Sequence, residues 1–386
     1  MERRAAVAAQ ARSIAAAWSP PGAPPSWWLT AETFTGIAED DVLLDLAVAI
    51  APDRLPALLL SAALRRRVTQ ARPDPLAGYY PAPGGPQPPR DGGFRPALRE
   101  FAAADAEAIA ALCAAHRYQM NEVGRCLDVL PALGAVAAAD PRPLALIDLG
   151  TGAGLGLHLD RYAYRYVLPD GSALHAGDPA SPVRLSCAVR TPMPQVQVQV
   201  PAVVHRVGVD AEPLDVTDPD TAAWLAACIP PEAGAVTRFA AALDVAAAHP
   251  VPAVRGDLLD VLGGVVADVP AAALLCLVDT YVHVFLPPDR LARFHALIDE
   301  IGRERDLEWV SVDPLVPLGP AADRSVQGLD VPPAWLLDNR EGGVFGLVGR
   351  VSVRGGRRTG TVLGRAHPSS AWLEWLSDPH RDLGIC

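Results

Sequence analysis

The chain has 386 residues, half of them apolar, so it can bury a substantial core in one large domain with an extension or in two ordinary domains. Its net charge of -11 opposes nonspecific binding to nucleic acid, because such binding depends on lysine and arginine displacing counterions from phosphates. All 33 basic residues are arginine. The absence of lysine excludes Schiff-base enzymes and Walker A phosphate-binding loops.

The cysteines and the apolar segments bear on location and partners. The six cysteines include no Cys-x-x-Cys pair and no histidine at ligand spacing, which argues against a disulfide framework and a structural zinc. Gln10 and Arg12 interrupt the apolar stretch that a signal peptide needs, and no segment offers the roughly 20 apolar residues of a membrane span. We expect a cytoplasmic protein with a small-molecule partner, without metal, nucleic acid or membrane, and with its oligomeric state open.

The first part of the chain has apolar residues at helical spacing, as at Leu43 and Ile50. Proline is concentrated in residues 19–25 and 81–96. Because proline removes a backbone donor, we expect these two segments to be surface loops between helices. The pattern predicts a helical N-terminal cap over residues 1–140.

The rest of the chain, residues 141–386, alternates short apolar runs with helical stretches, which is the pattern of a covered parallel sheet. We predict strands at 144–149, 203–209, 251–254, 274–278, 309–312, 344–353 and 359–363. We predict helices at 152–162, 218–227, 235–248, 289–305 and 371–376. A Gly-Gly turn before the last strand indicates a hairpin. The fold class is therefore α/β, a mostly parallel sheet with a C-terminal antiparallel hairpin.

A β insertion is expected at about residues 162–202, between the first helix and the second strand of the sheet. Tyrosines alternate with other residues at Tyr162, Tyr164 and Tyr166, and glutamine alternates with valine over 195–200. A period of two predicts antiparallel strands with one solvent-exposed face.

The strongest local motif is Asp-Leu-Gly-Thr-Gly-Ala-Gly at residues 148–154, which follows a predicted strand. Glycines allow a sharp turn and let backbone N–H groups approach a ligand. The helix predicted next would add the positive end of its dipole, which suits a carboxylate. A dinucleotide site requires Gly-x-Gly-x-x-Gly, but the third position is Leu155 or Leu157. A tight turn without a ligand is the alternative.

Two further acids follow predicted strands. Asp210 ends the segment Val-Gly-Val-Asp-Ala-Glu-Pro, although the usual spacing of about 20 residues beyond the glycine loop would favour Asp170. Asp257 follows Arg-Gly and precedes Leu258. Either Asp210 or Asp257 could instead cap a turn or a helix.

Polar residues at the end of the fourth strand, Asp279, Tyr281 and His283, are candidates for substrate contact, because open α/β sheets bind ligands at their carboxyl edge. His283 is a candidate general base or a histidine packed at a strand end. Before the first strand, Asn121 and Arg125 have the spacing of one helical face. Arg125 is suited to bind a ligand carboxylate bidentately or to form a surface pair with glutamate.

These segments resemble an uncharacterised bacterial domain-of-unknown-function family with a class I S-adenosylmethionine-dependent methyltransferase-like fold. The resemblance covers nearly the whole chain and is carried by residues 121–126, 148–154, 160–162, 177–182, 213–216, 255–257, 367–368 and 372–375. It implies S-adenosylmethionine as cofactor. The glycine loop, with Gly150, Thr151, Gly152 and Gly154, would face the methionine part, and Asp148 the amino group.

The same resemblance implies that Asp210 accepts hydrogen bonds from the ribose hydroxyls and that Asp257 and Leu258 contact the adenine. We therefore expect an S-adenosylmethionine-dependent methyltransferase that acts on an unknown small molecule. The alternative is a catalytically silent protein of the same fold that binds a nucleoside metabolite as a sensor or scaffold. A hydrolase is disfavoured because the Gly-x-Ser-x-Gly and His-Glu-x-x-His motifs are absent.

Overall fold

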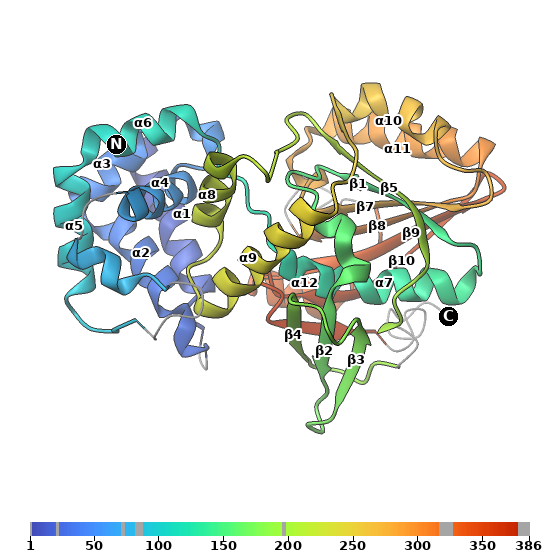
Figure 1. The fold of residues 1–386 in the computed structure, drawn as a ribbon, viewed down its shortest axis with the longest axis horizontal. Helices are drawn as coiled ribbons and strands as arrows, with labels where there is room; N and C mark the ends of the chain where they lie inside the picture. Colours follow the sequence, from blue (N-terminus) through green and yellow to red (C-terminus); the bar gives the residue numbers. More distant parts are fainter. Residues whose placement is uncertain are drawn as a thin grey trace. The chain divides into compact units, whose positions relative to one another are not determined.

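The computed structural model describes residues 2–20, 23–70, 74–81, 88–194, 198–315 and 327–376. The chain forms two compact units, and Figure 1 labels most of their helices and strands. Unit 1 comprises Met1–Glu122 and Asp215–Leu243, and unit 2 comprises Val123–Leu214 and Asp244–Cys386. This division differs from the expected boundary at residue 140.

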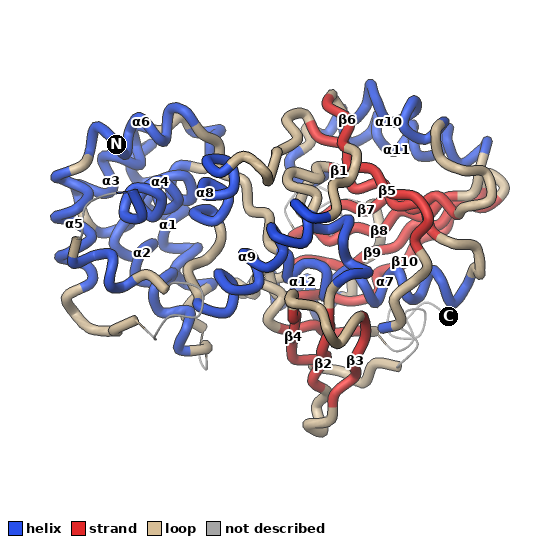
Figure 2. Tube along the Cα trace, in the orientation of Figure 1, coloured by secondary structure: helices blue, strands red, loops and turns tan. Residues whose placement is uncertain are grey.

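The described residues of unit 1 form helices, blue in Figure 2, joined by loops, which are tan, and include no strand. Its α-helices are α1 (Glu2–Ala17), α2 (Trp28–Glu39), α3 (Asp41–Ala49), α4 (Pro56–Gln70), α5 (Phe94–Ala104), α6 (Ala106–Ala115), α8 (Pro219–Cys228) and the first part of α9 (Ala233–Ala248). Short 3-10 turns are η1 (Pro25–Trp27), η2 (Pro52–Arg54) and η3 (Pro75–Tyr79). Leu59, Leu60 and Leu64 of α4 are fully buried in the unit's core.

Two polar contacts, each to a buried glutamate, join the separate chain segments of unit 1. Arg238 Nε donates to Glu122 Oε1 at 2.9 Å, and Thr30 Oγ1 donates to Glu232 Oε1 at 3.0 Å. Each contact pairs a residue of 1–122 with one of 215–243. These pairs help to explain why residues 215–243, which follow the strand predicted at 203–209, belong to the helical unit.

Unit 2 is built on an eleven-stranded sheet in the order β3-β2-β4-β11-β10-β9-β8-β7-β1-β5-β6. The strands are β1 (Leu144–Leu149), β2 (Ala163–Val167), β3 (Ala173–Gly177), β4 (Arg184–Val189), β5 (Val203–Asp210), β6 (Ala253–Arg255), β7 (Leu274–Thr280), β8 (Leu307–Pro314), β9 (Gly346–Arg354), β10 (Arg357–Ala366) and β11 (Trp372–Trp375). More neighbouring pairs are parallel than antiparallel. The structure therefore confirms an α/β fold with a large, mostly parallel sheet.

The central strands β6, β5, β1, β7 and β8 are parallel to one another. In chain order they run outward from β1 in one direction and then resume on its other side at β7. In open α/β sheets such a reversal marks the place where ligands bind, beyond the carboxyl ends of the strands. The carboxyl ends of β1 and β7 therefore define the candidate functional edge of unit 2.

Helices cover both faces of this central sheet, as Figure 1 shows. Residues of α10 (Leu258–Ala267) and α11 (Pro288–Glu304) share a buried apolar cluster with Ile147 and Leu149 of β1. On the other face, α7 (Cys126–Ala139) packs on β8 and β9. Because α7 is apolar on most of its surface, helical spacing alone could not show that it belongs to the sheet rather than to the helical cap.

Several predicted elements differ from the observed ones. Residues 152–162 form the 3-10 segment η5 (Leu155–Arg161), with non-helical dihedrals at His158, instead of an α-helix. Residues 371–376 form β11 instead of a helix, because they pair with β10 and β4. Two helices were not predicted, α10 and α12 (Pro333–Arg340).

The expected β insertion is present as β2, β3 and β4. Side chains alternate between buried and more exposed positions in β2 and β4, whereas β3 has no buried residue. The expected antiparallel pairing holds for β2 and β3, but β2 and β4 pair in parallel. It extends the main sheet, because β4 pairs with β11 in parallel. The predicted glutamine-valine strand is not formed at residues 198–200, and its residues 195–197 lie outside the described residues. Residues 82–87 of the predicted proline-rich loop also lie outside them. The loop itself ends earlier than expected, because α5 begins at Phe94. Among the helices in the described ranges, none has the length and apolar character needed to cross a membrane.

Candidate functional site

The glycine loop after β1 has the backbone that its sequence predicts. Gly150, Gly152 and Gly154 have φ angles of 66°, 53° and 71°, in the left-handed region that favours glycine. A Cβ atom at position 150 would lie 2.5 Å from Cγ2 of Val282. Glycine at 150 is therefore required by both its dihedral angle and the close approach of the segment after β7.

The amide groups of this loop bond within the protein. Gly150 N and Thr151 N donate to Val209 O, Gly152 N donates to Asp210 Oδ2 at 2.9 Å, and Gly154 N donates to Thr151 O. The expectation of bare amide donors is wrong at these four positions. The α-helix expected to direct its dipole at a ligand is not formed here, because the loop is followed by a short 3-10 segment that His158 interrupts. Side chains must therefore supply most of the recognition at this edge.

Two acids flank the loop at the ends of adjacent strands. Thr151 Oγ1 donates to Asp148 Oδ2 at 2.8 Å, and Asp210 Oδ1 accepts from Glu212 N at 2.8 Å. Asp148 is in register with Gly208, two residues before Asp210, so both acids point to the same face of the sheet. Burial, with the nearby charge of Asp210, raises the pKa of Asp148 to about 7, although its side chain keeps some access to solvent.

The other candidate acids have local structural partners. Asp170 lies in the exposed turn between β2 and β3 and accepts from Ser172, so Asp210 is the acid beside the glycine loop. Asp257 caps α10 by accepting from Leu259 N at 3.0 Å, and Arg290 Nη2 donates to its two oxygens at 2.7 and 2.6 Å. Leu258, its expected partner in adenine contact, is the first residue of α10.

Arg125 brings a positive charge to the edge. It ends the turn η4 (Val123–Arg125), its guanidinium lies 4.6 Å from the ring centroid of Tyr281, and Nη1 donates to Thr280 O at 3.4 Å. Its charge favours the ionised form of Asp148. Asn121 does not share a helical face with it, because residues 116–122 are not helical, and Asn121 belongs to unit 1.

Tyr281 has an unusual backbone. Its φ of 60° is uncommon for a bulky non-glycine residue and indicates local strain, which often accompanies functional sites. Its amide still donates to Val312 O at 2.8 Å, so the turn begins while the chain is paired with β8. Among the described residues, the buried Tyr281 hydroxyl has no hydrogen-bond partner.

A second polar cluster contains Asp279, His283 and Asp313, and each of the three side chains is buried. His283 Nδ1 lies 2.7 Å from Asp279 Oδ2, which also accepts from Trp309 Nε1 at 2.6 Å. Asp313 Oδ2 accepts from Ser311 Oγ at 2.7 Å. Burial raises the pKa of Asp279 to about 7 and lowers the pKa of His283 to about 4. Burial therefore favours the uncharged forms of both groups, a protonated carboxyl and a neutral imidazole.

This buried cluster and the glycine-loop acids lie on opposite faces of the sheet. Asp279 is in register with Leu149, whereas Asp148 is in register with Val278, and successive residues of a strand point to opposite sides. Asp313 was not predicted from the sequence. It is 34 positions beyond Asp279, and only the pairing of β7 with β8 brings the two acids together.

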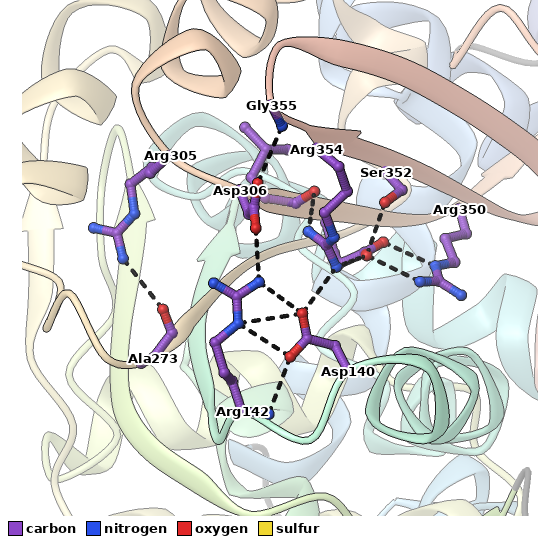
Figure 3. A network of polar contacts seen from close by, with 11 residues as sticks. Asp140, Arg142, Ala273, Arg305, Asp306, Arg350, Ser352, Arg354 and Gly355 are labelled. Atoms are coloured by element: carbon purple, nitrogen blue, oxygen red, sulfur yellow. Dashed lines mark hydrogen bonds and ion pairs between the residues drawn. The ribbon is translucent and has the colours of Figure 1, made fainter.

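A network of ion pairs lies at the opposite edge, where the parallel strands begin (Figure 3). The fully buried Glu308 accepts from Arg350 Nε and Nη2 at 2.8 and 2.9 Å and also pairs with Arg354. Arg142 donates to Asp140 at 2.6 Å and to Asp306 at 2.9 Å. Each carboxylate of this network therefore has an arginine partner.

Comparison with known proteins agrees with the resemblance carried by the sequence motifs. No curated protein matches the chain. A family model described as "Uncharacterized protein conserved in bacteria (DUF2332)" matches residues 4–375. This match spans nearly the whole sequence, including the glycine loop and the cluster of Asp279, His283 and Asp313. The chain therefore belongs to the DUF2332 family of bacterial proteins.

Proposed function

We propose that unit 2 binds S-adenosylmethionine at the carboxyl edge of β1 and β5 and that the protein methylates a small molecule. The observation that carries this proposal is the position of Asp148 and Asp210, which lie at the carboxyl ends of adjacent parallel strands beside a left-handed glycine loop. This edge adjoins the point where the strand order reverses. The strand order β6-β5-β1-β7-β8 also supports a Rossmann-like core of the methyltransferase type.

The charges at the edge suit the zwitterionic amino-acid part of this cofactor. Asp148 would accept from the amino group, and Arg125, whose charge acts on Asp148, would bind the carboxylate. Arginine replaces the loop amides in this role, because those amides bond internally. Each oxygen of Asp210 accepts one backbone N–H and retains acceptor capacity for a ribose hydroxyl.

The cofactor would supply an electrophilic methyl group, and the protein would contribute mainly by orienting it toward the acceptor. A general base is needed only when the acceptor must lose a proton. Asp279 and His283 have no exposed side-chain surface, so we do not assign them that role in the described structure. Tyr281, which lies against Arg125, remains the candidate for contact with the acceptor.

A second candidate function is a nucleoside-metabolite sensor or scaffold without catalysis. The burial of both titratable candidates for a base, Asp279 and His283, favours it. It uses the same binding edge as the first candidate. The two functions therefore differ in turnover and agree in ligand binding.

Calorimetric titration of the full chain with S-adenosylmethionine and S-adenosylhomocysteine tests both functions. We expect saturable binding that Asp210→Asn weakens at least tenfold, while Asp170→Asn, the same change at an exposed turn, leaves it unaltered. Binding together with transfer of a labelled methyl group to a metabolite extract supports the enzyme. Binding without transfer to any acceptor supports the sensor. If neither nucleoside binds to the folded wild-type protein, both functions are rejected.

A further inference from the structure

We propose that Asp279, His283 and Asp313 form a binding site for one divalent first-row transition-metal ion. Potential ligand atoms of the three residues, two carboxylate oxygens and one imidazole nitrogen, lie within 4.8 Å of one another. Two atoms bonded to one such ion at roughly 2.1 Å are at most about 4.2 Å apart, so only small side-chain movements are needed. The site does not depend on the proposed nucleoside cofactor.

The cluster contains polar atoms that the rest of the protein leaves unsatisfied. Within the described parts of the chain, Oδ1 of Asp279, Oδ1 of Asp313 and both ring nitrogens of His283 are buried without a hydrogen-bond partner. His283 Nδ1 is close to Asp279 Oδ2, but the pair lacks the angle of a hydrogen bond. Buried polar atoms are almost always satisfied, so a ligand between these atoms accounts for their arrangement.

The charge of the cluster also favours a cation. Two carboxylates are buried here, and no arginine among the described residues forms an ion pair with Asp279 or Asp313. An unpaired buried carboxylate is costly, and such groups are normally paired, protonated or bound to a metal. The histidine ligand selects among metals, because imidazole suits zinc, iron and related ions, whereas Mg²⁺ and Ca²⁺ prefer oxygen ligands alone.

Neighbouring side chains orient the proposed ligands as outer partners do in metal sites. Trp309 Nε1 fixes one oxygen of Asp279 and Ser311 Oγ fixes one oxygen of Asp313, which leaves the other oxygen of each acid available. The His283 ring packs against Phe294, with ring centroids 4.1 Å apart. The ligand geometry is therefore held by residues that are themselves buried.

The site has a structural consequence for the strained turn. Asp279 and His283 lie two residues before and two residues after Tyr281, whose φ is 60°. An ion bound to both would close a loop around this residue, and its contact with Asp313 would attach that loop to β8. Such a clamp supplies the constraint that a left-handed tyrosine requires. We infer that the metal has a positioning role at the carboxyl edge.

Metal analysis of the full-length protein, followed by calorimetric titration of chelator-treated protein with Zn²⁺ or Mn²⁺ alone, tests the site. We expect one equivalent of metal per chain, and no comparable binding of Mg²⁺ or Ca²⁺. Asp313→Asn and His283→Gln should each weaken binding at least 100-fold. Ser311→Ala, which removes only an orienting hydrogen bond, should weaken it about tenfold. The controls are Asp170→Asn and His175→Gln, which make the same changes at exposed positions.

The outcomes distinguish a bound metal from a proton shared between Asp279 and Asp313. Such a proton is the other way to reduce the negative charge of the two carboxylates. Failure of folded wild-type protein to bind either Zn²⁺ or Mn²⁺ saturably would overturn the proposal and favour the proton. Binding that survives in both Asp313→Asn and His283→Gln would place the metal elsewhere, and also overturn it. Because the wild-type result alone can reject the site, the test does not depend on the stability of the variants.

Discussion

The two edges of the sheet in unit 2 hold buried acids in opposite electrostatic settings. At the edge where the strands begin, Glu308 is surrounded by Arg350 and Arg354, and the whole network is balanced by arginine (Figure 3). At the carboxyl edge, Asp279 and Asp313 have no arginine partner among the residues that the structure describes. Charge that is already compensated stabilises a fold, whereas uncompensated charge is available for a ligand, and perturbed acids of this kind are concentrated at functional sites.

This difference is informative because both edges contain similar residue types. Acids occur at both, and both are formed by the same strands. Composition and fold class therefore cannot distinguish a structural edge from a functional one. The distinguishing feature is the partner of each carboxylate, which must be read residue by residue.

The largest expected effect is at the balanced edge. Glu308→Gln keeps the shape of the side chain but leaves Arg350 and Arg354 without their shared carboxylate, so we expect a loss of about 3 kcal/mol in unfolding free energy. Urea denaturation followed by tryptophan fluorescence measures it. Asp299→Asn, which removes an exposed partner of Arg358, should cost below about 0.5 kcal/mol. Equal losses for the two variants would contradict the assigned role of the network.

The pH dependence of stability should have opposite signs at the two edges. The hydrogen bonds of Arg142 lower the pKa of Asp140 to about 2, so its contribution is present above about pH 4 and lost as the pH falls toward 2. Burial raises the pKa of Asp148 to about 7, so stability should decline as the pH rises from about 4 to 7.

Between pH 4 and pH 2, the free energy of unfolding should fall by about 2 kcal/mol less in Asp140→Asn than in the wild-type protein. Between pH 4 and pH 7, the free energy of unfolding should fall by about 1–2 kcal/mol less in Asp148→Asn than in the wild-type protein. This value is reduced because the Asp148 side chain is partly exposed. Denaturation curves measured from pH 2 to 8 distinguish these effects. Parallel curves for Asp148→Asn and wild type would show that this acid is not perturbed.

The sequence predicts the central strands well for a physical reason. Strands covered on both faces are continuous apolar runs bounded by turns, and β1 begins and ends at the predicted residues. The segment after the glycine loop was predicted wrongly, because Gly154 and Gly156 weaken a helix and the chain continues as a 3-10 turn. Trp372 and Trp375 have helical spacing, but Trp372 pairs with β4 and Trp375 pairs with β10, which makes both part of a strand.

The candidate site could be predicted only where one strand carries its residues. Asp279 lies near the end of β7 and His283 follows this strand only four residues later, so their proximity follows from the sequence. Asp313 comes from β8, and the arginines around Glu308 come from β9, so neither group has a local signal. The sequence also cannot show that the amides of the glycine loop bond to Val209 and Asp210.

A smaller effect is expected at the carboxyl edge without metal. Asp313→Asn in chelator-treated protein replaces a buried carboxyl group that no arginine pairs with, among the described residues, by a neutral amide. The amide oxygen can still accept from Ser311, so stability should change by less than about 1 kcal/mol or increase. Asp306→Asn, at the balanced edge, should be destabilising because Arg142 and Gly355 N contact that carboxylate. Thermal unfolding in excess chelator compares them. A loss of several kcal/mol for Asp313→Asn would mean that this acid has a stabilising partner.

The smallest effect concerns single hydroxyl groups. Tyr281→Phe removes a buried hydroxyl that has no partner among the described residues, so we expect no loss and a gain of up to about 1 kcal/mol. Tyr166→Phe is the matched control, because its hydroxyl donates to Leu127 O at 3.0 Å and should cost about 1 kcal/mol. If Tyr281→Phe proves as destabilising as the control, its hydroxyl is satisfied in the free protein. If stability is unchanged or improved but binding of S-adenosylmethionine or of the acceptor weakens, the Tyr281 hydroxyl contacts a ligand. That result would extend to a hydroxyl the contrast between paired groups where the strands begin and unpaired groups at the carboxyl edge.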